Sequence, residues 1–69
     1  MTLHEAIIQV FNDTGKEQMT TQEIADILNE NNLYEKKDGS EITAFQIHGR
    51  TRNYGHLFDR DGSTVKLAQ

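Results

Sequence analysis

The sequence predicts an α+β fold in which three helices are followed by a two-stranded β-hairpin. Three copies of the capping-box pattern, Ser/Thr-x-x-Glu/Gln, each stand directly before residues at helical spacing. The last part of the chain changes to an alternation of apolar and polar residues around Asp61-Gly62, which is typical of a hairpin. With 69 residues, the chain is expected to form one domain over residues 1–69.

The first helix is expected over about residues 3–14. Thr2 and Glu5 form the first capping box, and Gly15 fits the left-handed residue that ends many helices. Apolar side chains recur at the i, i+3, i+4 and i+7 positions of a one-sided helix. These side chains are Leu3, Ala6, Ile7, Val10 and Phe11.

The second helix is expected over about residues 21–31, after a capping box formed by Thr20 and Glu23. Its apolar stripe consists of Ile24, Ile27 and Leu28. The polar run at residues 29–32 is expected to break it.

The segment after the second helix is polar apart from its first two residues. Leu33 and Tyr34 are expected to fold back onto the core. Residues 35–41 are polar, and Asp38-Gly39 within them predicts a turn.

The third helix is expected over about residues 44–54, after the capping box of Thr43 and Gln46. Gly49 in its interior disfavours the helix by roughly 1 kcal/mol relative to alanine. Gly55 is expected to end it. The side chains predicted to share its inward face are Ile47, Thr51 and Tyr54.

The hairpin is expected to turn at Asp61-Gly62, because a type I′ turn needs positive φ at both central residues. Arg60 and Lys66 are expected to point outward or toward the tip. A hairpin of two strands is not stable alone, so it should lie against the helices and pair with a short strand near Met19. The side chains predicted to face inward are Phe58, Val65 and Leu67.

The net charge of −4 is unevenly distributed along the chain. Residues 1–31 carry six acidic side chains against Lys16 alone, whereas residues 42–69 carry four basic side chains against two acidic ones. The acids fall on the first two expected helices, where a solvated helix face accounts for them.

Several classes of function are disfavoured by what the chain lacks. Without cysteine, disulfides and thiolate metal sites are excluded. His4, His48 and His56 are too dispersed for a metal motif, and no spacing suggests a nucleophile with its base or a glycine-rich phosphate cradle. No apolar run approaches a membrane span and no signal peptide is recognised. We therefore expect a cytoplasmic protein that is not an enzyme and needs no cofactor, metal or membrane.

An ordered set of short motifs runs along nearly the whole chain. They are Thr14-Gly15-Lys16, Met19-Thr20-Thr21-Gln22-Glu23-Ile24-Ala25, Leu33-Tyr34, Lys37-Asp38-Gly39, Gln46-Ile47, Arg50, Tyr54 and Leu57-Phe58. At these spacings the set resembles the HARE-HTH family of winged helix-turn-helix domains. The sequence departs from the family pattern at Thr51, where an apolar residue is common, and at Phe45, where a polar residue is common.

The resemblance implies a winged helix-turn-helix fold, with the hairpin as the wing, and a role linked to DNA. Domains of this family resemble adaptors in chromatin factors, in DNA-modifying and restriction systems and in a bacterial RNA polymerase accessory subunit. One expectation is therefore a module that binds double-stranded DNA in transcription or DNA modification. The alternative is a protein-binding module that associates with RNA polymerase or a larger DNA-modifying enzyme, which suits an acidic chain.

The third helix is the candidate recognition helix, because a helix fits the major groove of DNA. Arg52 could bind guanine or phosphate, Asn53 could pair with adenine, and Gly49 would permit close approach. Arg60 and Lys66 could hold the phosphate backbone; the alternative is that all these positions are solvated polar sites. The residues expected at the DNA interface are Phe45, Gln46, His48, Gly49, Arg52, Asn53, Arg60 and Lys66.

Phe45 has two interpretations. An outward aromatic ring at the head of the third helix could touch a thymine methyl group or a protein partner. The alternative, which the sequence favours slightly, is that the ring packs on Leu33 or Tyr34.

Three further basic residues have structural interpretations that we favour over DNA contact. Arg50 is expected at the edge of the buried face, paired with Glu23 or Glu30. Lys36 and Lys37 could reach phosphates, but nearby acids favour a solvated turn.

Overall fold

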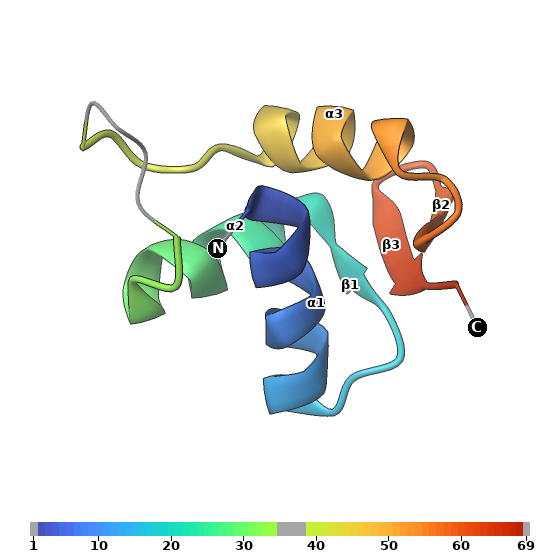
Figure 1. Cartoon of the computed structure of the whole chain (residues 1–69), viewed down its shortest axis with the longest axis horizontal. Coiled ribbons are helices and arrows are strands. Elements are labelled where there is room, and N and C mark those ends of the chain that lie inside the picture. Colours follow the sequence, from blue (N-terminus) through green and yellow to red (C-terminus); the bar gives the residue numbers. More distant parts are fainter. Residues whose placement is uncertain (1, 35–38, 69) are drawn as a thin grey trace.

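The computed structural model describes residues 2–34 and 39–68, and within them it contains three helices and a three-stranded antiparallel sheet. This α+β architecture is consistent with the winged helix-turn-helix fold that the sequence predicts. Figure 1 shows α3 lying across α1 and α2, with the sheet beside the end of α3. The elements in chain order are α1 (Leu3–Thr14), β1 (Met19–Thr20), α2 (Thr21–Asn31), α3 (Ala44–Asn53), β2 (Phe58–Asp61) and β3 (Thr64–Leu67).

Some predictions cannot be compared with the structure. Lys36 and Lys37, with their predicted phosphate contacts, lie outside the described residues, as does Asp38 of the predicted turn. Over the ranges 2–34 and 39–68, no helix combines the length and apolar character that crossing a bilayer requires.

All three predicted capping boxes are formed. The side chains of Thr2, Thr20 and Thr43 each accept a hydrogen bond from the backbone amide three residues later, and the side chain at that position accepts one from the cap amide. Each box pairs two amide groups that a helix start leaves without a helical acceptor, which explains why the helices begin at the predicted residues.

The helix ends agree with prediction twice and differ once. Gly15 follows α1 at φ 70°, and Asn32 follows α2 at φ 52°, so both lie in the left-handed region. The expectation that Gly55 ends the third helix is wrong: α3 stops at Asn53 with Tyr54 as its C-cap. The Tyr54 carbonyl accepts from the amides of residues 57 and 58, at 2.8 and 3.1 Å, so a turn closes the helix without a left-handed glycine.

The core lies between the three helices and the inner face of the sheet. Met19 and Ile42 belong to it, and each stands directly before the Thr that caps a helix. That position typically packs an apolar side chain onto the first turns of the helix that follows. As predicted, Leu33 and Tyr34 are partly buried against the core. Its buried members are Leu3, Ala6, Ile7, Val10, Phe11, Met19, Ile24, Ala25, Leu28, Ile42, Ile47, Phe58 and Val65.

The connection between α2 and α3 runs through residues 32–43, which is longer than the three- or four-residue turn of a minimal helix-turn-helix. Asn29, which was expected to help break the second helix, lies inside α2 and clips the far end of this connection. Its carboxamide donates to the carbonyl oxygen of Ile42 and accepts from the Ile42 amide, both at 2.9 Å. This two-bond clip fixes where α3 begins relative to α2.

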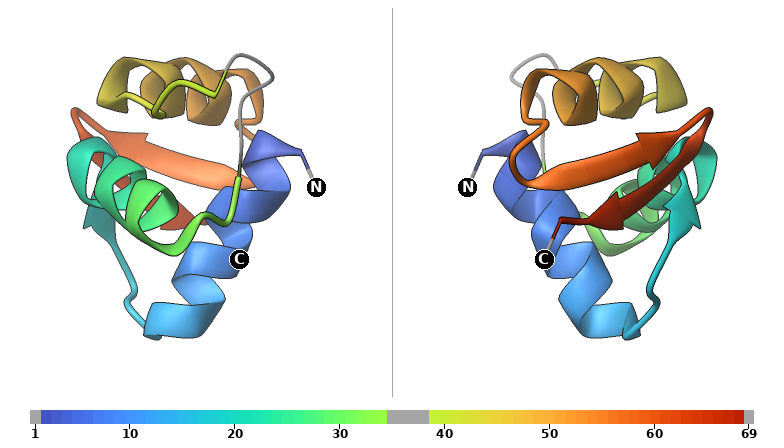
Figure 2. Two further views of the ribbon diagram at one scale, coloured as in Figure 1. Left: turned by 90° about the vertical axis from the view of Figure 1, so that its left-hand side faces the viewer. Right: turned by 90° about the vertical axis from the view of Figure 1, so that its right-hand side faces the viewer.

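The sheet has the order β1-β3-β2, so β3 is its central strand. The predicted short strand near Met19 is confirmed, because Met19 pairs with Val65 in antiparallel register. Figure 2 shows the hairpin below α3, with β1 on the far side of β3 from β2. The third strand helps hold the wing against the helices.

The hairpin turn differs from prediction by one residue. Asp61 pairs with Thr64, so the two-residue loop is Gly62-Ser63 rather than Asp61-Gly62. Only Gly62 of this loop has positive φ, at 64°. A type I′ turn needs positive φ at both central residues, so the prediction of that turn at Asp61-Gly62 is wrong.

Candidate nucleic-acid interface

Two fully buried side chains, Ile47 and Thr51, seat α3 on the core, as predicted. The Thr51 hydroxyl donates to the Ile47 carbonyl oxygen at 2.9 Å, so a polar residue is accommodated at a position with no access to water. Because successive helical residues are about 100° apart, the opposite side of α3 faces outward. Arg52 and Asn53 are exposed on that side, as predicted.

Phe45 is 85% exposed, and no other large hydrophobic side chain in the described part of the chain is classed as exposed. The interpretation that it packs on Leu33 or Tyr34 is therefore wrong. Phe45 precedes the buried Ile47 by two residues, which places it about 200° around the helix axis, away from the core. The ring stands at the head of α3, available to another molecule.

Gly49 lies in the interior of α3, on the same side as Phe45 and four residues further along. A Cβ atom at this position would meet nothing within 4 Å. Packing inside the protein therefore does not require glycine here, although glycine is unfavourable in a helix interior. The residue leaves α3 without a side chain in the middle of its outer face.

The two residues predicted to flank this surface are held by the fold. Gln46 is the reciprocal member of the α3 capping box, and its Oε1 accepts from the Thr43 amide at 2.9 Å. His48 contacts the wing: Nη2 of Arg60 lies 2.8 Å from its Nδ1 and 3.0 Å from its Nε2. Both side chains therefore already have partners within the protein.

Arg60 does not point outward, as was predicted. It is the cross-strand partner of buried Val65 and shares a face of β2 with buried Phe58, because side chains two apart on a strand lie on one side. That alternation was visible in the sequence and could have placed Arg60 correctly. Lys66 lies one residue from Val65 in β3 and is exposed, as predicted.

Arg50 makes a different contact from the one predicted. Its guanidinium carbon lies 5.9 Å from the centre of the Tyr54 ring, at the outer limit of a cation–π contact. The predicted pairing with Glu23 or Glu30 is wrong. The ion pair found among residues 2–34 and 39–68 joins Lys16 to Glu23 at 3.3 Å, while the other carboxylate oxygen of Glu23 accepts from the α2 cap amide.

A ladder of aromatic rings joins the start of α1 to the end of α3. The rings of His4 and Tyr54 are stacked with centroids 4.1 Å apart, and His56 lies beyond Tyr54 at 5.9 Å. These residues come from separate segments, so no local pattern predicts the ladder. Two of the three histidines thus serve packing, and no metal-binding group of three or more His, Asp or Glu gathers in the described part of the chain.

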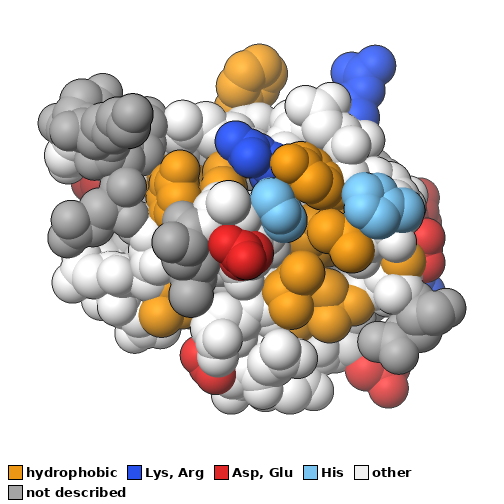
Figure 3. All heavy atoms as spheres, in the orientation of Figure 1, with side chains coloured by type: hydrophobic (Ala, Val, Ile, Leu, Met, Phe, Trp, Pro, Cys, Tyr) orange, Lys and Arg blue, Asp and Glu red, His pale blue; other side chains and the backbone are white. Residues whose placement is uncertain are grey.

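The charges on the surface follow the division seen along the sequence. On the face shown in Figure 3, the prominent Lys and Arg side chains lie toward the α3 side, and most Asp and Glu side chains lie lower or at the rim. Arg52 and Lys66 take part in none of the ion pairs found among the described residues. They are therefore available to an anionic partner.

Two acidic side chains are committed to helix starts. The Thr2 amide holds the pKa of Glu5 below its ordinary value of 4.5, chiefly by donating a hydrogen bond to the carboxylate. The Thr20 amide lowers the pKa of Glu23 in the same way, with a smaller contribution from Lys16. Both carboxylates act in local structure rather than at the α3 surface.

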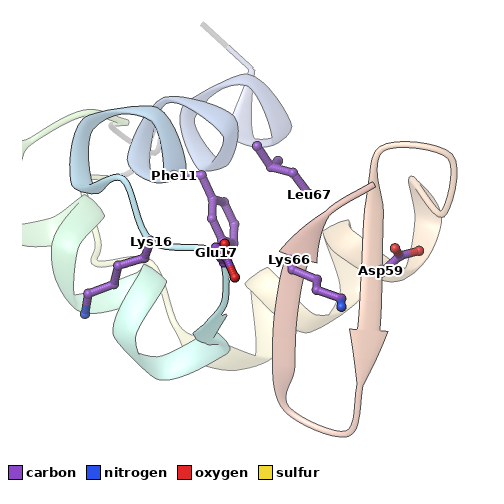
Figure 4. Close-up of a pocket in the computed structure, with 6 residues that line it drawn as sticks. All are labelled: Phe11, Lys16, Glu17, Asp59, Lys66 and Leu67. Carbon is purple, nitrogen blue, oxygen red and sulfur yellow. The ribbon is translucent and has the colours of Figure 1, made fainter. Parts of the chain in front are cut away.

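The hollows of the surface do not assemble a catalytic centre. A cleft of about 490 Å³ lies between the end of α1, the segment before β1 and the hairpin (Figure 4). Phe11 and Leu67 form its apolar part, and side chains of both signs, including Asp59 and Lys66, line it. A smaller groove of about 330 Å³ lies under the head of α3, with Phe45 among its lining residues.

Comparison with known proteins agrees with the resemblance seen in the short motifs. The HARE-HTH family model, whose description names the HTH domain of ASXL proteins and restriction endonucleases, matches residues 1–69, the whole chain. No curated protein and no solved structure matches the chain.

Proposed function

Because the chain belongs to the HARE-HTH family of helix-turn-helix domains, we propose that it binds double-stranded DNA through the outer face of α3. The observation that carries this proposal is the composition of that face. It combines an exposed aromatic ring, a glycine without a packing role, and polar groups outside any ion pair of the described residues. A helix of this kind fits the major groove, which is about 12 Å wide.

Each residue of the face has a chemical counterpart on DNA. The Arg52 guanidinium matches the two acceptors of guanine or a phosphate, and the Asn53 carboxamide matches the donor and acceptor of adenine. Phe45 would place an apolar ring against the C5-methyl group of thymine. Gly49 would let the edges of the groove approach the helix backbone.

The wing would lie on the phosphate backbone beside this face. Lys66 is its exposed cation, and the acidic Asp59 is its cross-strand partner. With few basic residues in the second half of the chain, the number of phosphate contacts is small, so we expect modest and strongly salt-dependent affinity. Such a module would serve as an adaptor or regulator in transcription or DNA modification, strengthened by a partner or by repetition.

A second candidate function rests on Phe45. An aromatic ring that is 85% exposed beside a groove is typical of the anchors that dominate protein interfaces. Together with the acidic first half, it supports association with a protein such as RNA polymerase or a larger DNA-modifying enzyme.

A titration separates the two functions. Labelled protein is titrated with a short random-sequence duplex at about 50 and then about 200 mM salt while amide chemical shifts are recorded by NMR. Shifts at Gly49, Arg52 and Asn53 that weaken with salt would support DNA binding. Absence of shifts at both salt concentrations would refute it and favour the protein partner.

The role of Phe45 can be tested on the same duplex. Replacing thymine with uracil removes the C5-methyl group and leaves the hydrogen-bonding edge unchanged. If Phe45 contacts that methyl group, the parent protein binds the uracil duplex more weakly, and the Phe45→Ala variant does not distinguish the two. Equal discrimination by both proteins would rule the contact out.

A further inference from the structure

Arg60 lies where β2, the hairpin loop and α3 meet. Its Nη2 lies within 3.0 Å of both ring nitrogens of His48 and donates to the Gly62 carbonyl oxygen at 3.2 Å. Nη2 carries two hydrogens, one for each of these partners. We propose that Arg60 is a positioning residue which, with His48, fixes the wing against α3, rather than a contact to phosphate. The inference rests on the proposed function, because it assigns how the α3 surface and the wing are held for DNA.

The burial of Arg60 supports this assignment. The residue is half-buried on the inner face of the hairpin, across from Val65. Its Nε is buried and has no hydrogen-bond partner among the described residues. An arginine that bound phosphate from solvent would keep this nitrogen in water, so the side chain is drawn inward at the cost of one unpaired donor.

The wing needs such a support because of its place in the sheet. β2 is an edge strand that pairs only with β3, and the Gly62-Ser63 loop extends past the paired residues. In the described part of the chain, the Arg60–His48 contact is the side-chain hydrogen bond that joins the hairpin to α3. Removing either partner leaves the angle of the wing to depend on apolar packing alone.

The contact also defines the state of His48. A guanidinium only donates, so the ring nitrogen that accepts from it must lack a proton. His48 therefore acts as an acceptor, and a carboxamide at position 48 could replace it. His48→Gln is the conservative variant, and His48→Ala is the variant that removes the acceptor.

The test is a double-mutant cycle of His48→Ala and Arg60→Gln, carried out on free and DNA-bound protein. In the free protein, both single variants and the double variant should shift the Gly62 amide resonance similarly and lower Tm by similar amounts, because all three break one contact. His48→Gln should restore the resonance. With a random-sequence duplex, each single variant should weaken binding about threefold to tenfold, and the double variant no further.

The salt dependence of binding distinguishes positioning from phosphate contact. Lys66→Gln is the matched control on the exposed side of the wing, and it should reduce the slope of log Kd against log salt by about 0.9. Arg60→Gln should leave the slope unchanged. A slope reduced as in the control, together with additive losses in the double variant, would overturn the proposal.

Failure of DNA binding would not hide the answer. If the parent protein binds no duplex, the proposed function fails, and the free-protein cycle still decides the role of Arg60. Non-additive shifts and Tm losses, with rescue by His48→Gln, would support the brace. Independent effects of the two substitutions on Gly62 and on Tm would refute it.

Discussion

Replacing Gly49 with alanine is expected to stabilise the fold and weaken DNA binding at the same time. Gly49 lies inside α3, its φ is not in the left-handed region, and an added Cβ would meet nothing within 4 Å. The substitution therefore gains the difference in helix propensity, about 1 kcal/mol, without a packing penalty. For a domain of this size, that corresponds to a rise in Tm of about 4–8 °C.

The loss of binding follows from the same open space. If the groove of DNA occupies it, the new methyl group forces the two surfaces apart. An overpacking penalty of about 1–2 kcal/mol corresponds to roughly a five- to thirtyfold increase in Kd. Thermal unfolding followed by circular dichroism gives the first quantity, and fluorescence anisotropy with a labelled duplex gives the second.

Gly55→Ala is the matched control for this prediction. Gly55 also has no atom within 4 Å of an added Cβ, but it lies past the end of α3. It should raise stability by at most about 1 kcal/mol, through the unfolded chain, and leave Kd unchanged. A lower Tm for Gly49→Ala would show that the site is crowded, and an unchanged Kd would show that nothing approaches this face closely.

Three further predictions concern stability. Ile47→Ala, at a fully buried position, should cost about 2–5 kcal/mol and largely unfold so small a domain, and a Tm within a few degrees of the parent would refute the core assignment. Asn29→Ala leaves both backbone groups of buried Ile42 unpaired and should cost about 1–3 kcal/mol by urea unfolding, whereas an unchanged midpoint would show that the clip does not matter. Because the pKa values of Glu5 and Glu23 are lowered in the folded protein, their stabilising effect is present above the ordinary value of 4.5 and lost as the pH falls through the folded-state pKa. Substituting both with Gln should therefore flatten the stability profile between about pH 6 and pH 3, and a profile as steep as the parent's would contradict this.

The helices were predicted to within one residue because their signals are local. A capping box spans four residues, and Thr2, Thr20 and Thr43 each begin a helix with their own N3 partner. The stripes at helical spacing likewise identified the buried faces. Family membership was predictable for a related reason, since it depends on short motifs in a set order rather than on any one contact.

The candidate surface was predicted in part. Arg52 and Asn53 follow from counting 100° steps away from Ile47. The same counting placed Phe45 outward, but the sequence could not say whether a ring at that position would bend onto Tyr34. Its exposure of 85% was decided by the core, which is closed at this end by the buried Ile42.

What the sequence determined by itself is the set of elements, the residues at which the helices begin, and the faces that the helices bury. These depend on side chains within about one helical turn of each other, so a linear pattern contains them. What only the tertiary structure decided is how the elements meet: the turn at Gly62, the inward Arg60 against His48, and the Tyr54 ring ladder. Those contacts join residues that are far apart along the chain, and their geometry exists only after the core has closed.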